Sequence, residues 1–289
     1  MEPQQVVITG LGQGMGRKAA LLLAKRGVAV AGFDVDEEGI RSLASELDAL
    51  GARHHLRCVD ITDRRAILRF RDAVLETLGH VDTVVSNVGV GFFGPFEEVD
   101  LEAALRCFEI NVIGAAAVFQ AFVPSMRERR TGKLVAISSL VGRIPFPFES
   151  IYSATKFALN GMVLSFKYEL APFGIEVALI EPAQVSTGFA AKIHKLPREG
   201  SPYRERVKRF IDRDNVLIKD APDPDRAAAK YVEVILSKHP KVYTQIDSDD
   251  VRGNRGYLPA RCLRTFPLGT GTAWTTGGCS ATSAPGRAS

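Results

Sequence analysis

Residues 6–16 of the chain read VVITGLGQGMG, an apolar β-branched run followed by glycine at every second position. The run predicts a buried strand, and the residues from about Gly14 to Arg26 predict a helix that Gly27 can end. Glycines in such a turn let the backbone approach a pyrophosphate, which the N-terminus of the following helix attracts. The turn is not a P-loop, because no Gly-Lys-Ser/Thr follows. We expect a dinucleotide-binding turn; the alternative is that the glycines only make a tight turn.

Short β-branched runs alternate with longer helical patterns over the first 180 residues. This alternation is typical of repeated βαβ units, which build a parallel sheet with helices on both faces. The expected strands are residues 6–8, 28–34, 56–59, 81–85, 134–137 and 175–180. Residues 187–220 are irregular, and a helix over 223–238 and a strand over 242–244 follow. The sequence thus predicts an α/β fold with a doubly wound parallel sheet.

Charge and composition narrow the classes of partner. The 289 residues carry a formal net charge of +4, and no basic run is longer than a pair such as Arg129-Arg130, so we expect no nucleic-acid surface. No stretch of eighteen apolar residues exists and no signal peptide follows Met1, so we expect no membrane span. The four cysteines lack CxxC spacing and the five histidines lack metal spacing, which predicts reduced thiols, no metal site and a cytoplasmic protein.

The character of the chain changes from about Asp247. In residues 265–289, Gly, Ser and Thr occupy 14 of 25 positions, a composition typical of a flexible tail. We expect one domain over residues 1–246 and an irregular tail over 247–289. A frame-shifted or truncated coding sequence would give the same kind of tail.

Acidic residues follow the second and third expected strands. Asp34 stands eighteen residues after Gly16, where a carboxylate can accept both ribose hydroxyls of an adenosine and would repel a 2′-phosphate. Gln13 and Val35, which are placed to meet that phosphate, are not basic. This pattern favours NAD over NADP; the alternative is a solvated acid that opens the next helix. Asp60 stands where a carboxylate could meet the adenine amino group.

Three polar side chains are expected at one edge of the sheet. Tyr152 and Lys156 are four residues apart at the start of an expected helix, so they share a face. An ammonium held close to a phenol lowers its pKa toward the range of an acid–base catalyst. Ser139 ends the fifth strand, on the edge where the glycine turn also lies, so two hydroxyls and a hydride carrier can converge on one carbonyl. Asn111 falls inside a long expected helix, where the plain alternative is a surface asparagine.

Residues 5–245 resemble the single-domain short-chain dehydrogenases/reductases, a family with a Rossmann-type fold. The order and spacing of the motifs carry the resemblance, and the TGxxGxxG turn of the family's longer branch does not match. The matching motifs are Thr9–Gly16 (TGxxxGxG), Asp60, Ser86-Asn87-Val88-Gly89, Asn111, Ser139, Tyr152-Ser-Ala-Thr-Lys156 and Pro182 to Thr187. The resemblance implies an NAD(P)-dependent oxidoreductase that acts on CH–OH groups.

The resemblance also implies roles for these residues. Tyr152 would be the general acid/base, and Lys156 would hold the nicotinamide ribose and lower the pKa of Tyr152. Ser139 would orient the substrate oxygen, and Asn111 would support a water relay behind Lys156. The expected cofactor contacts are Gly10, Gly14, Met15, Gly16, Asp34, Asp60, Ile61, Asn87, Gly89, Tyr152, Lys156, Pro182, Val185 and Thr187, the last three at the carboxamide end of the cofactor.

Some positions depart from the family pattern. Ser86 and Val88 replace the usual Asn and Ala, and Ala183 replaces the usual Gly after Pro182. Ser139 is preferred to Ser138 as the catalytic serine, because the family's serine stands three residues before a glycine.

Two loops at the catalytic edge are rich in phenylalanine. Residues 90–96 read VGFFGPF and residues 144–148 read IPFPF, which suggests an apolar pocket or, equally, rings that only cap the core. These stretches resemble the 17β-hydroxysteroid and retinol dehydrogenase subgroup, which implies a lipophilic secondary alcohol or ketone as substrate. Residues 188–218 would form the lid. Helices over 101–130 and 152–173 could pair with a second copy, as in the family, to give a homodimer or homotetramer.

Two other functions compete with this interpretation. The chain could be a non-catalytic NAD-binding sensor, which the presence of all four catalytic residue types disfavours. It could also be a dehydrogenase with a damaged C-terminus that folds but cannot close its pocket.

Overall fold

The computed structural model describes residues 4–183, 197–219 and 224–246. The chain divides into two units, residues 1–252 and 253–289, and every described residue belongs to the first. The expected tail over 247–289 lies outside the described residues, as do residues 188–196 of the expected lid and the cofactor residues Val185 and Thr187.

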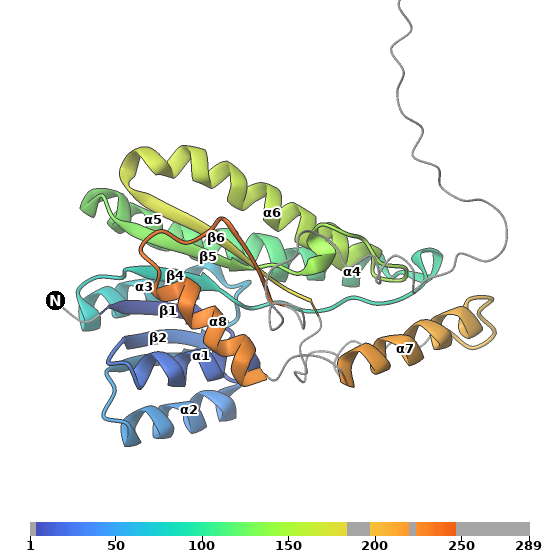
Figure 1. Cartoon of the computed structure of the whole chain (residues 1–289), viewed down its shortest axis with the longest axis horizontal. Coiled ribbons are helices and arrows are strands. Elements are labelled where there is room, and N and C mark those ends of the chain that lie inside the picture. The colour runs from blue at the N-terminus through green and yellow to red at the C-terminus, as the bar shows by residue number, and fades with distance from the viewer. Residues whose placement is uncertain (1–3, 184–196, 220–223, 247–289) are drawn as a thin grey trace, which may run out of the picture. The chain divides into compact units, whose positions relative to one another are not determined.

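Among the described residues, seven strands form one parallel sheet in the order β3-β2-β1-β4-β5-β6-β7 (Figure 1). The strands are β1 (Gln5–Thr9), β2 (Ala29–Asp34), β3 (His54–Cys58), β4 (Thr83–Ser86), β5 (Gly132–Ile137), β6 (Ile175–Pro182) and β7 (Tyr243–Ile246). The strand order reverses between β1 and β4, and ligands of such sheets bind in the crevice beyond the strand ends at that point. The sheet confirms the predicted doubly wound, Rossmann-type fold.

Helices cover both faces of the sheet (Figure 1). They are α1 (Gly14–Ala24), α2 (Glu37–Ala49), α3 (Arg64–Leu78), α4 (Leu101–Phe108), α5 (Ala115–Arg129), α6 (Ser150–Leu170) and α8 (Pro224–Leu236). A further helix, α7 (Arg204–Lys219), does not lie on the sheet in Figure 1 and replaces part of the irregular stretch expected over residues 187–220. Shorter helical turns are η1 (Phe96–Glu98), η2 (Glu109–Gly114), η3 (Leu140–Gly142) and η4 (Ala171–Phe173). Asp36 and Asp63 cap α2 and α3 by accepting hydrogen bonds from the Gly39 and Ala66 N–H groups.

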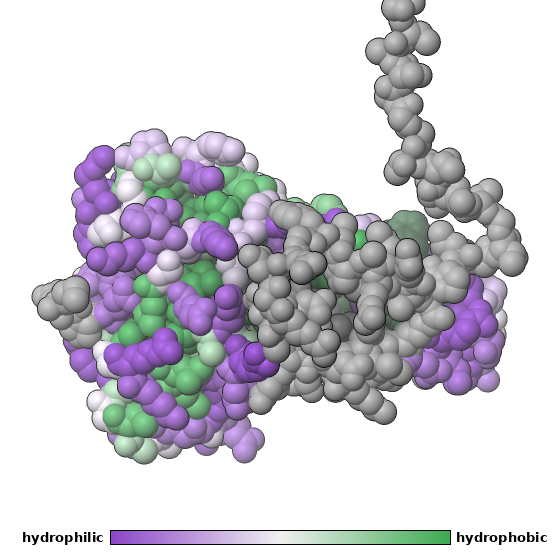
Figure 2. Space-filling model, viewed as in Figure 1, coloured by the Kyte–Doolittle hydropathy of each residue, from purple (hydrophilic) through white to green (hydrophobic). Residues whose placement is uncertain are grey.

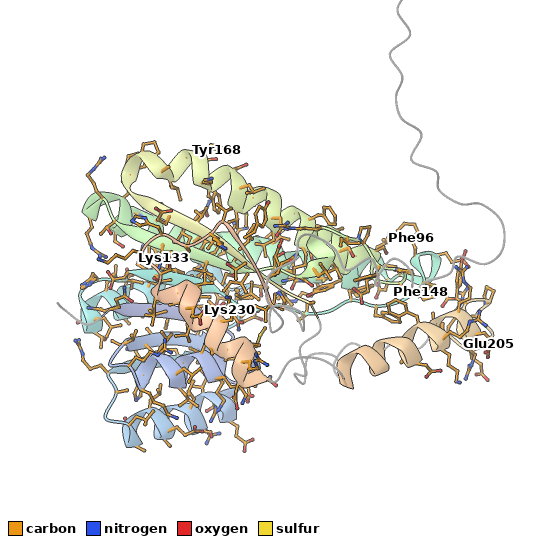
Figure 3. The ribbon with its side chains drawn as sticks, viewed as in Figure 1. Phe96, Lys133, Phe148, Tyr168, Glu205 and Lys230 are labelled. Carbon is orange, nitrogen blue, oxygen red and sulfur yellow. The ribbon has the colours of Figure 1, made fainter. Side chains whose placement is uncertain are left out.

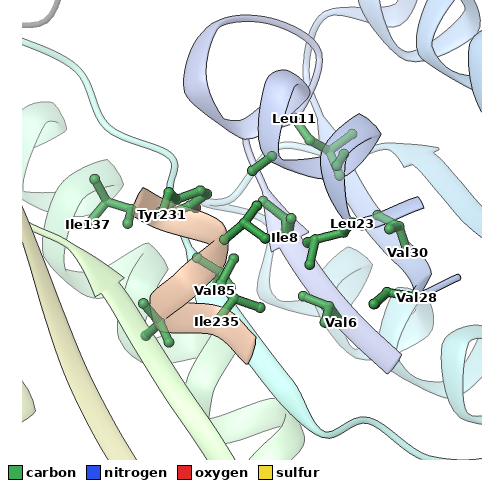
Figure 4. Packing of buried hydrophobic residues seen from close by; sticks show 14 of the residues in the cluster. Val6, Ile8, Leu11, Leu23, Val28, Val30, Val85, Ile137, Tyr231 and Ile235 are labelled. Atoms are coloured by element: carbon green, nitrogen blue, oxygen red, sulfur yellow. The ribbon is translucent and has the colours of Figure 1, made fainter. Parts of the chain in front are cut away.

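The strand alternation divides the apolar residues between two cores. Val6 and Ile8 of β1 belong to one core, which includes α1, α2 and α8, while Val7 belongs to the other, which includes α3, α5 and α6. Figure 4 shows the first core, with Leu23 of α1 and Tyr231 of α8 on the same side of the sheet. At the lower left of Figure 2, where α1, α2 and α8 lie in Figure 1, green hydrophobic residues lie between purple hydrophilic ones. The chain therefore buries both faces of its sheet, as parallel sheets do.

The long helix expected over residues 101–130 is not a continuous α-helix. The π-helical turn η2 interrupts it between α4 and α5, and Gly114 at its end lies against Ile61. A Cβ on Gly114 would stand 2.8 Å from Cγ1 of Ile61, so only glycine permits this approach. Such π-turns are often found at functional sites.

One helix of the described residues, Leu101–Arg129, is long and apolar enough to span a membrane by length and composition. Half of its most apolar window is buried inside the fold, where α5 contributes Val118, Phe119 and Phe122 to the second core. A helix that is buried in the core of a globular protein meets the same criteria of length and composition. The expected absence of a membrane span stays a prediction.

Candidate active site

The glycine turn after β1 requires glycine at several positions. Gly10 and Gly14 have φ angles of +70° and +61°, a region that other residues rarely adopt. A Cβ on Gly16 would stand 2.5 Å from the carbonyl oxygen of Gly10, so the turn and the start of α1 are in close contact. Met15 is partly buried against the first core. The turn is thus a tight backbone cradle at the N-terminus of α1.

Asn87, which follows β4, holds this cradle in place. Its Nδ2 donates hydrogen bonds to the carbonyl oxygens of Thr9 (3.0 Å) and Gly10 (2.8 Å). The backbone N–H groups of Asn87 and Val88 donate to Oγ1 of Thr9. The family resemblance implies that Asn87 contacts the cofactor, and the structure adds a supporting role for its side chain.

The carboxylate of Asp34 lies beside the cradle. Its Oδ2 accepts a hydrogen bond from the Gly12 N–H (2.9 Å), and its Oδ1 accepts one from the Asp36 N–H (3.1 Å). The Arg17 guanidinium donates to the carbonyl oxygen of the same Gly12 (3.1 Å) and to Gly39 O (2.9 Å). Val35 is exposed next to Asp34. The Asp34 carboxylate, which is predicted to bind the ribose, is therefore hydrogen-bonded to the glycine turn.

Asp60 and Ile61 differ in how they can meet an adenine ring. Oδ1 of Asp60 accepts hydrogen bonds from Thr62 (N–H and hydroxyl), and its Oδ2 pairs with Arg106 at 3.1 Å. Burial acts to raise the pKa of Asp60, but the hydrogen bonds from Thr62 and the charge of Arg106 outweigh it and lower this pKa. The Ile61 side chain is buried against Gly114, so only its backbone can face a cofactor.

Ser139, Tyr152 and Lys156 come together at the ends of β5 and β6. Ser139 forms a hydrogen bond with Tyr152, and its Oγ also lies 3.5 Å from the carbonyl oxygen of Pro182. Nζ of Lys156 lies 5.6 Å from the centroid of the Tyr152 ring and donates a hydrogen bond to Ile137 O (2.9 Å). The three groups that the sequence placed at one edge are therefore neighbours.

Ser138, the alternative serine, is buried, and its Oγ lacks a hydrogen-bond partner among the described residues. A Cβ on Gly142 would stand 2.9 Å from this Oγ and 3.2 Å from Cβ of Lys156. The glycine three residues after Ser139 thus lets η3 pack against α6. This arrangement favours Ser139 as the serine that faces Tyr152.

Burial dominates the pKa values of the two titratable groups. Burial raises the pKa of Tyr152, Glu149 raises it further, and the hydrogen bond from Ser139 opposes this change. Burial lowers the pKa of Lys156 to about 8, against an opposing effect of Cys107. The pKa of Tyr152 is therefore shifted upward, against the expectation that Lys156 lowers it.

Asn111 lies in η2 with its side chain buried and fully engaged. Its Oδ1 accepts a hydrogen bond from the Val90 N–H, and its Nδ2 donates to Val90 O (2.9 Å) and to Oγ1 of Thr155 (3.0 Å). The Nδ2 also lies 3.4 Å from Sγ of Cys107. Because the amide is occupied in this way, a water relay behind Lys156 would have to use the Asn111 backbone, and that role stays a prediction. The contacts that Thr155 and Cys107 make with the Asn111 side chain were not predicted from the sequence.

Gly89 lies next to both Lys156 and Asn111. A Cβ there would stand 3.4 Å from Nζ of Lys156 and 3.5 Å from Oδ1 of Asn111. Gly89 therefore leaves open space beside the Lys156 ammonium, on the same strand end as Asn87. Pro182 ends β6 nearby, and the Ala183 N–H donates a hydrogen bond to Ile246 O (2.9 Å).

Aromatic side chains from both phenylalanine-rich loops meet α7. Phe210 lies 5.3 Å from Phe93 and 5.8 Å from Phe148 between ring centroids, and Tyr203 lies 6.5 Å from Phe148. Figure 3 shows Phe148 beside α7. Phe148 has a φ of +65°, and its carbonyl oxygen accepts a hydrogen bond from the Gly94 N–H (2.8 Å). Phe96 is exposed and does not belong to this aromatic cluster of Phe93, Phe148, Tyr203 and Phe210.

Comparisons with known proteins identify the family of the chain. The family model for short chain dehydrogenases matches residues 4–197. The 17-beta-hydroxysteroid dehydrogenase type 1 of Mus musculus is 30% identical over 254 residues, which cover 83% of this chain and 72% of the mouse protein.

Two solved structures are each 26% identical to the chain. An alcohol dehydrogenase from Thermococcus sibiricus, complexed with 5-hydroxy-NADP, has a TM-score of 0.72, with 89% of this chain and 100% of that chain covered. A short chain dehydrogenase/reductase from Burkholderia phymatum, in complex with NAD, has a TM-score of 0.74, with 84% of this chain and 88% of that chain covered. Together with the family match over residues 4–197, these likenesses show that the chain belongs to the short-chain dehydrogenase family and is an oxidoreductase acting on CH–OH groups.

Proposed function

We propose that the protein is an NAD(H)-dependent oxidoreductase that interconverts a lipophilic secondary alcohol and its ketone, with a steroid, retinoid or other lipid-like skeleton. The observation that carries the proposal is the meeting of Ser139, Tyr152 and Lys156 beside Gly89. Two hydroxyls and an ammonium there can bind a substrate oxygen and move its proton.

The residues present fit a nicotinamide dinucleotide. Gly16 and Gly10 form a cradle that a Cβ would fill, and the N-terminus of α1 follows it directly. The similar structures bind NAD or an NADP derivative, which supports a nicotinamide cofactor. Asp34, which accepts a hydrogen bond from the turn, and the exposed apolar Val35 beside it support NAD over NADP.

The bound nicotinamide would supply the hydride acceptor, so that an alcohol that also loses its hydroxyl proton to Tyr152 becomes a ketone. Ser139 donates a hydrogen bond to the substrate oxygen and keeps it next to the phenol. Lys156 holds its positive charge within reach of the Tyr152 ring and favours the phenolate. Burial raises the pKa of Tyr152 and so favours the protonated phenol, the form that donates a proton to a ketone oxygen in the reverse reaction.

The aromatic cluster supports a lipophilic substrate. Phe93 and Phe148 come from the two loops beside the site, and Phe210 of α7 contacts both, tilted to Phe93 and edge to face with Phe148. A cluster of aromatic rings suits a flat apolar molecule. The similarity to mouse 17-beta-hydroxysteroid dehydrogenase type 1 points in the same direction.

We also propose that the protein forms a homodimer or homotetramer through α4 and α6. Large apolar side chains are exposed on both helices, namely Leu101 and Leu105 on α4 and Phe157 and Tyr168 on α6. Isolated apolar residues are ordinary on a protein surface, but two adjacent helices that each carry them favour an interface. Light scattering of the full chain measures the state directly.

A substrate panel tests the function. Steroid, retinoid, long-chain and small polar alcohols and ketones are offered with NAD(H) and NADP(H), and NADH absorbance is followed. Turnover of the apolar compounds with NAD(H) is expected. Cofactor binding without turnover of any compound would favour the sensor or the damaged dehydrogenase, and preferred turnover of small polar alcohols would contradict the substrate class.

A further inference from the structure

Near the proposed catalytic residues lies a group of three polar side chains, the buried Asn160 and Glu181 and the partly buried Arg143. The Glu181 side chain is 0% exposed, although it precedes Pro182 directly at the end of β6. Its Oε1 accepts hydrogen bonds from Nε of Arg143 (2.9 Å) and Nδ2 of Asn160 (3.1 Å). Burial raises the pKa of Glu181, and the contacts with Arg143 and Asn160 oppose this change.

Arg143 and Asn160 come from the two segments that carry Ser139, Tyr152 and Lys156, and Glu181 comes from the neighbouring strand β6. Arg143 directly follows η3, which Ser139 caps through its Oγ. Asn160 lies on α6, four residues after Lys156 and eight after Tyr152, and so faces the same side of the helix. Nδ2 of Asn160 also donates to the carbonyl oxygen of Gly142 (3.2 Å), which joins α6 to η3 a second time.

The surroundings leave this group little room to shift. A Cβ on Gly142 would stand 3.0 Å from Nδ2 of Asn160. The guanidinium of Arg143 stacks on the ring of Tyr243 of β7, with Cζ 3.8 Å from the centroid. Oε1 of Glu181 therefore links the Ser139 turn to α6, while its Oε2 is buried without a hydrogen-bond partner among the described residues.

Stability alone does not explain a buried ion pair at this place. Well-packed apolar residues of similar volume often stabilise a fold as well or better than a buried charged pair does. What a charged, hydrogen-bonded set adds is one defined geometry, and proton transfer depends on geometry, since a displacement of about 1 Å can cost about a hundredfold in rate.

We propose that Glu181 is a positioning residue that fixes Ser139 relative to Tyr152 and Lys156 through Arg143 and Asn160. The inference rests on the proposed function of Ser139 and Tyr152 and adds the residues that hold them in register. Glu181 itself does not touch the reacting atoms in this role.

The test is a double-mutant cycle between Glu181→Gln and Ser139→Ala, with kcat, KM and NADH affinity measured for each variant. We expect Glu181→Gln to lower kcat about tenfold or more while KM and the Kd for NADH stay within about twofold. We also expect Ser139→Ala to cost much less in the Glu181→Gln background than in the unaltered protein, because Ser139 is already misplaced there. If Glu181 had a purely structural role, the fold-losses in kcat from Glu181→Gln and Ser139→Ala would multiply in the double variant.

The matched control is Glu176→Gln, which removes a half-exposed glutamate of the same strand that pairs with His239. This control should leave kcat unchanged. If Glu181→Gln does not fold, as judged by cooperative melting and NADH binding, Asn160→Leu replaces it in the cycle, since it cuts the same link without removing a charge.

The outcomes separate the two proposals. Unchanged kcat in Glu181→Gln or Asn160→Leu, or effects that multiply with Ser139→Ala, overturns the positioning role while the proposed function stands. No turnover by the unaltered protein on any substrate overturns the proposed function, and the positioning role with it.

Discussion

The side-chain amide of Asn111 pairs with the backbone of Val90 as a neighbouring strand would, accepting from its N–H (2.8 Å) and donating to its C=O (2.9 Å). The loop that begins at Val90 leads to Phe93, which belongs to the aromatic cluster. A residue inside a π-turn thus holds the backbone that leads to the proposed substrate pocket. Through Oγ1 of Thr155 the same amide is joined to α6.

Replacing Asn111 should therefore affect both stability and activity. We expect Asn111→Leu to lower the free energy of unfolding by about 1–3 kcal/mol, because backbone groups of Val90 lose their partner. We also expect kcat/KM to fall about tenfold or more as the loop loosens. Urea unfolding and steady-state kinetics measure the two effects, and Glu109→Gln in the same turn is the control. An Asn111→Leu variant of full stability and activity would show that the pairing is dispensable.

The buried ammonium of Lys156 predicts a pH dependence of stability. Its pKa is about 8 in the fold and near 10.5 for the free side chain, so between these values the unfolded chain binds more protons. The cost of burying this charge is therefore present below pH 8 and is relieved as the pH rises toward 10.5. Relative to Lys156→Met, the unaltered protein should gain up to about 3 kcal/mol over that range. Urea unfolding of both proteins at several pH values measures this, and parallel curves would contradict the low pKa.

Asp34 should determine the choice between NAD and NADP. We expect a preference for NAD in the unaltered protein, because the Asp34 carboxylate repels a 2′-phosphate. Asp34→Ala combined with Val35→Arg should raise the ratio of kcat/KM for NADP to that for NAD by about tenfold or more, since position 35 is exposed beside the ribose site. Glu37→Gln, in the first turn of α2, serves as the control. Similar kcat/KM for both cofactors before any substitution would remove the argument from Asp34.

Phe210 should contribute to substrate affinity and not to the chemical step. Its ring contacts Phe93 and Phe148 in the aromatic cluster proposed to bind the substrate, and one aromatic contact with a flat apolar substrate would contribute about 0.5–1.5 kcal/mol. We expect Phe210→Ala to raise KM for an apolar alcohol about threefold to tenfold, with little change in kcat or NADH affinity. Leu68→Ala, which removes an exposed apolar side chain on α3, should change neither. A loss of kcat at constant KM would place Phe210 outside the substrate pocket.

Much of the fold could be predicted from the sequence, because the decisive signals are local. The run before Thr9, the glycines after it and the βα alternation define the parallel sheet and the turn. The residues of the candidate site could be predicted as well, since Ser139, Tyr152 and Lys156 follow a strand end and a helix start that meet on one edge.

Other features depend on contacts between distant residues and could not be predicted. The π-turn at Asn111 is accompanied by the close approach of Gly114 to Ile61, about fifty residues away in sequence. The Glu181 group joins residues from three elements, and no spacing in the sequence indicates it. The raised pKa of Tyr152 results mainly from burial, which the proximity of Lys156 in the sequence does not reveal.

Tyr152→Phe tests the central claim most directly, because it removes one hydroxyl and keeps the ring. NADH formation with the best alcohol of the panel and NADH binding by fluorescence are measured on the same preparation. We predict that turnover is abolished while the Kd for NADH changes no more than a few-fold. Retained turnover at a rate near that of the unaltered protein would show that another group moves the proton, and the account of the site would be wrong.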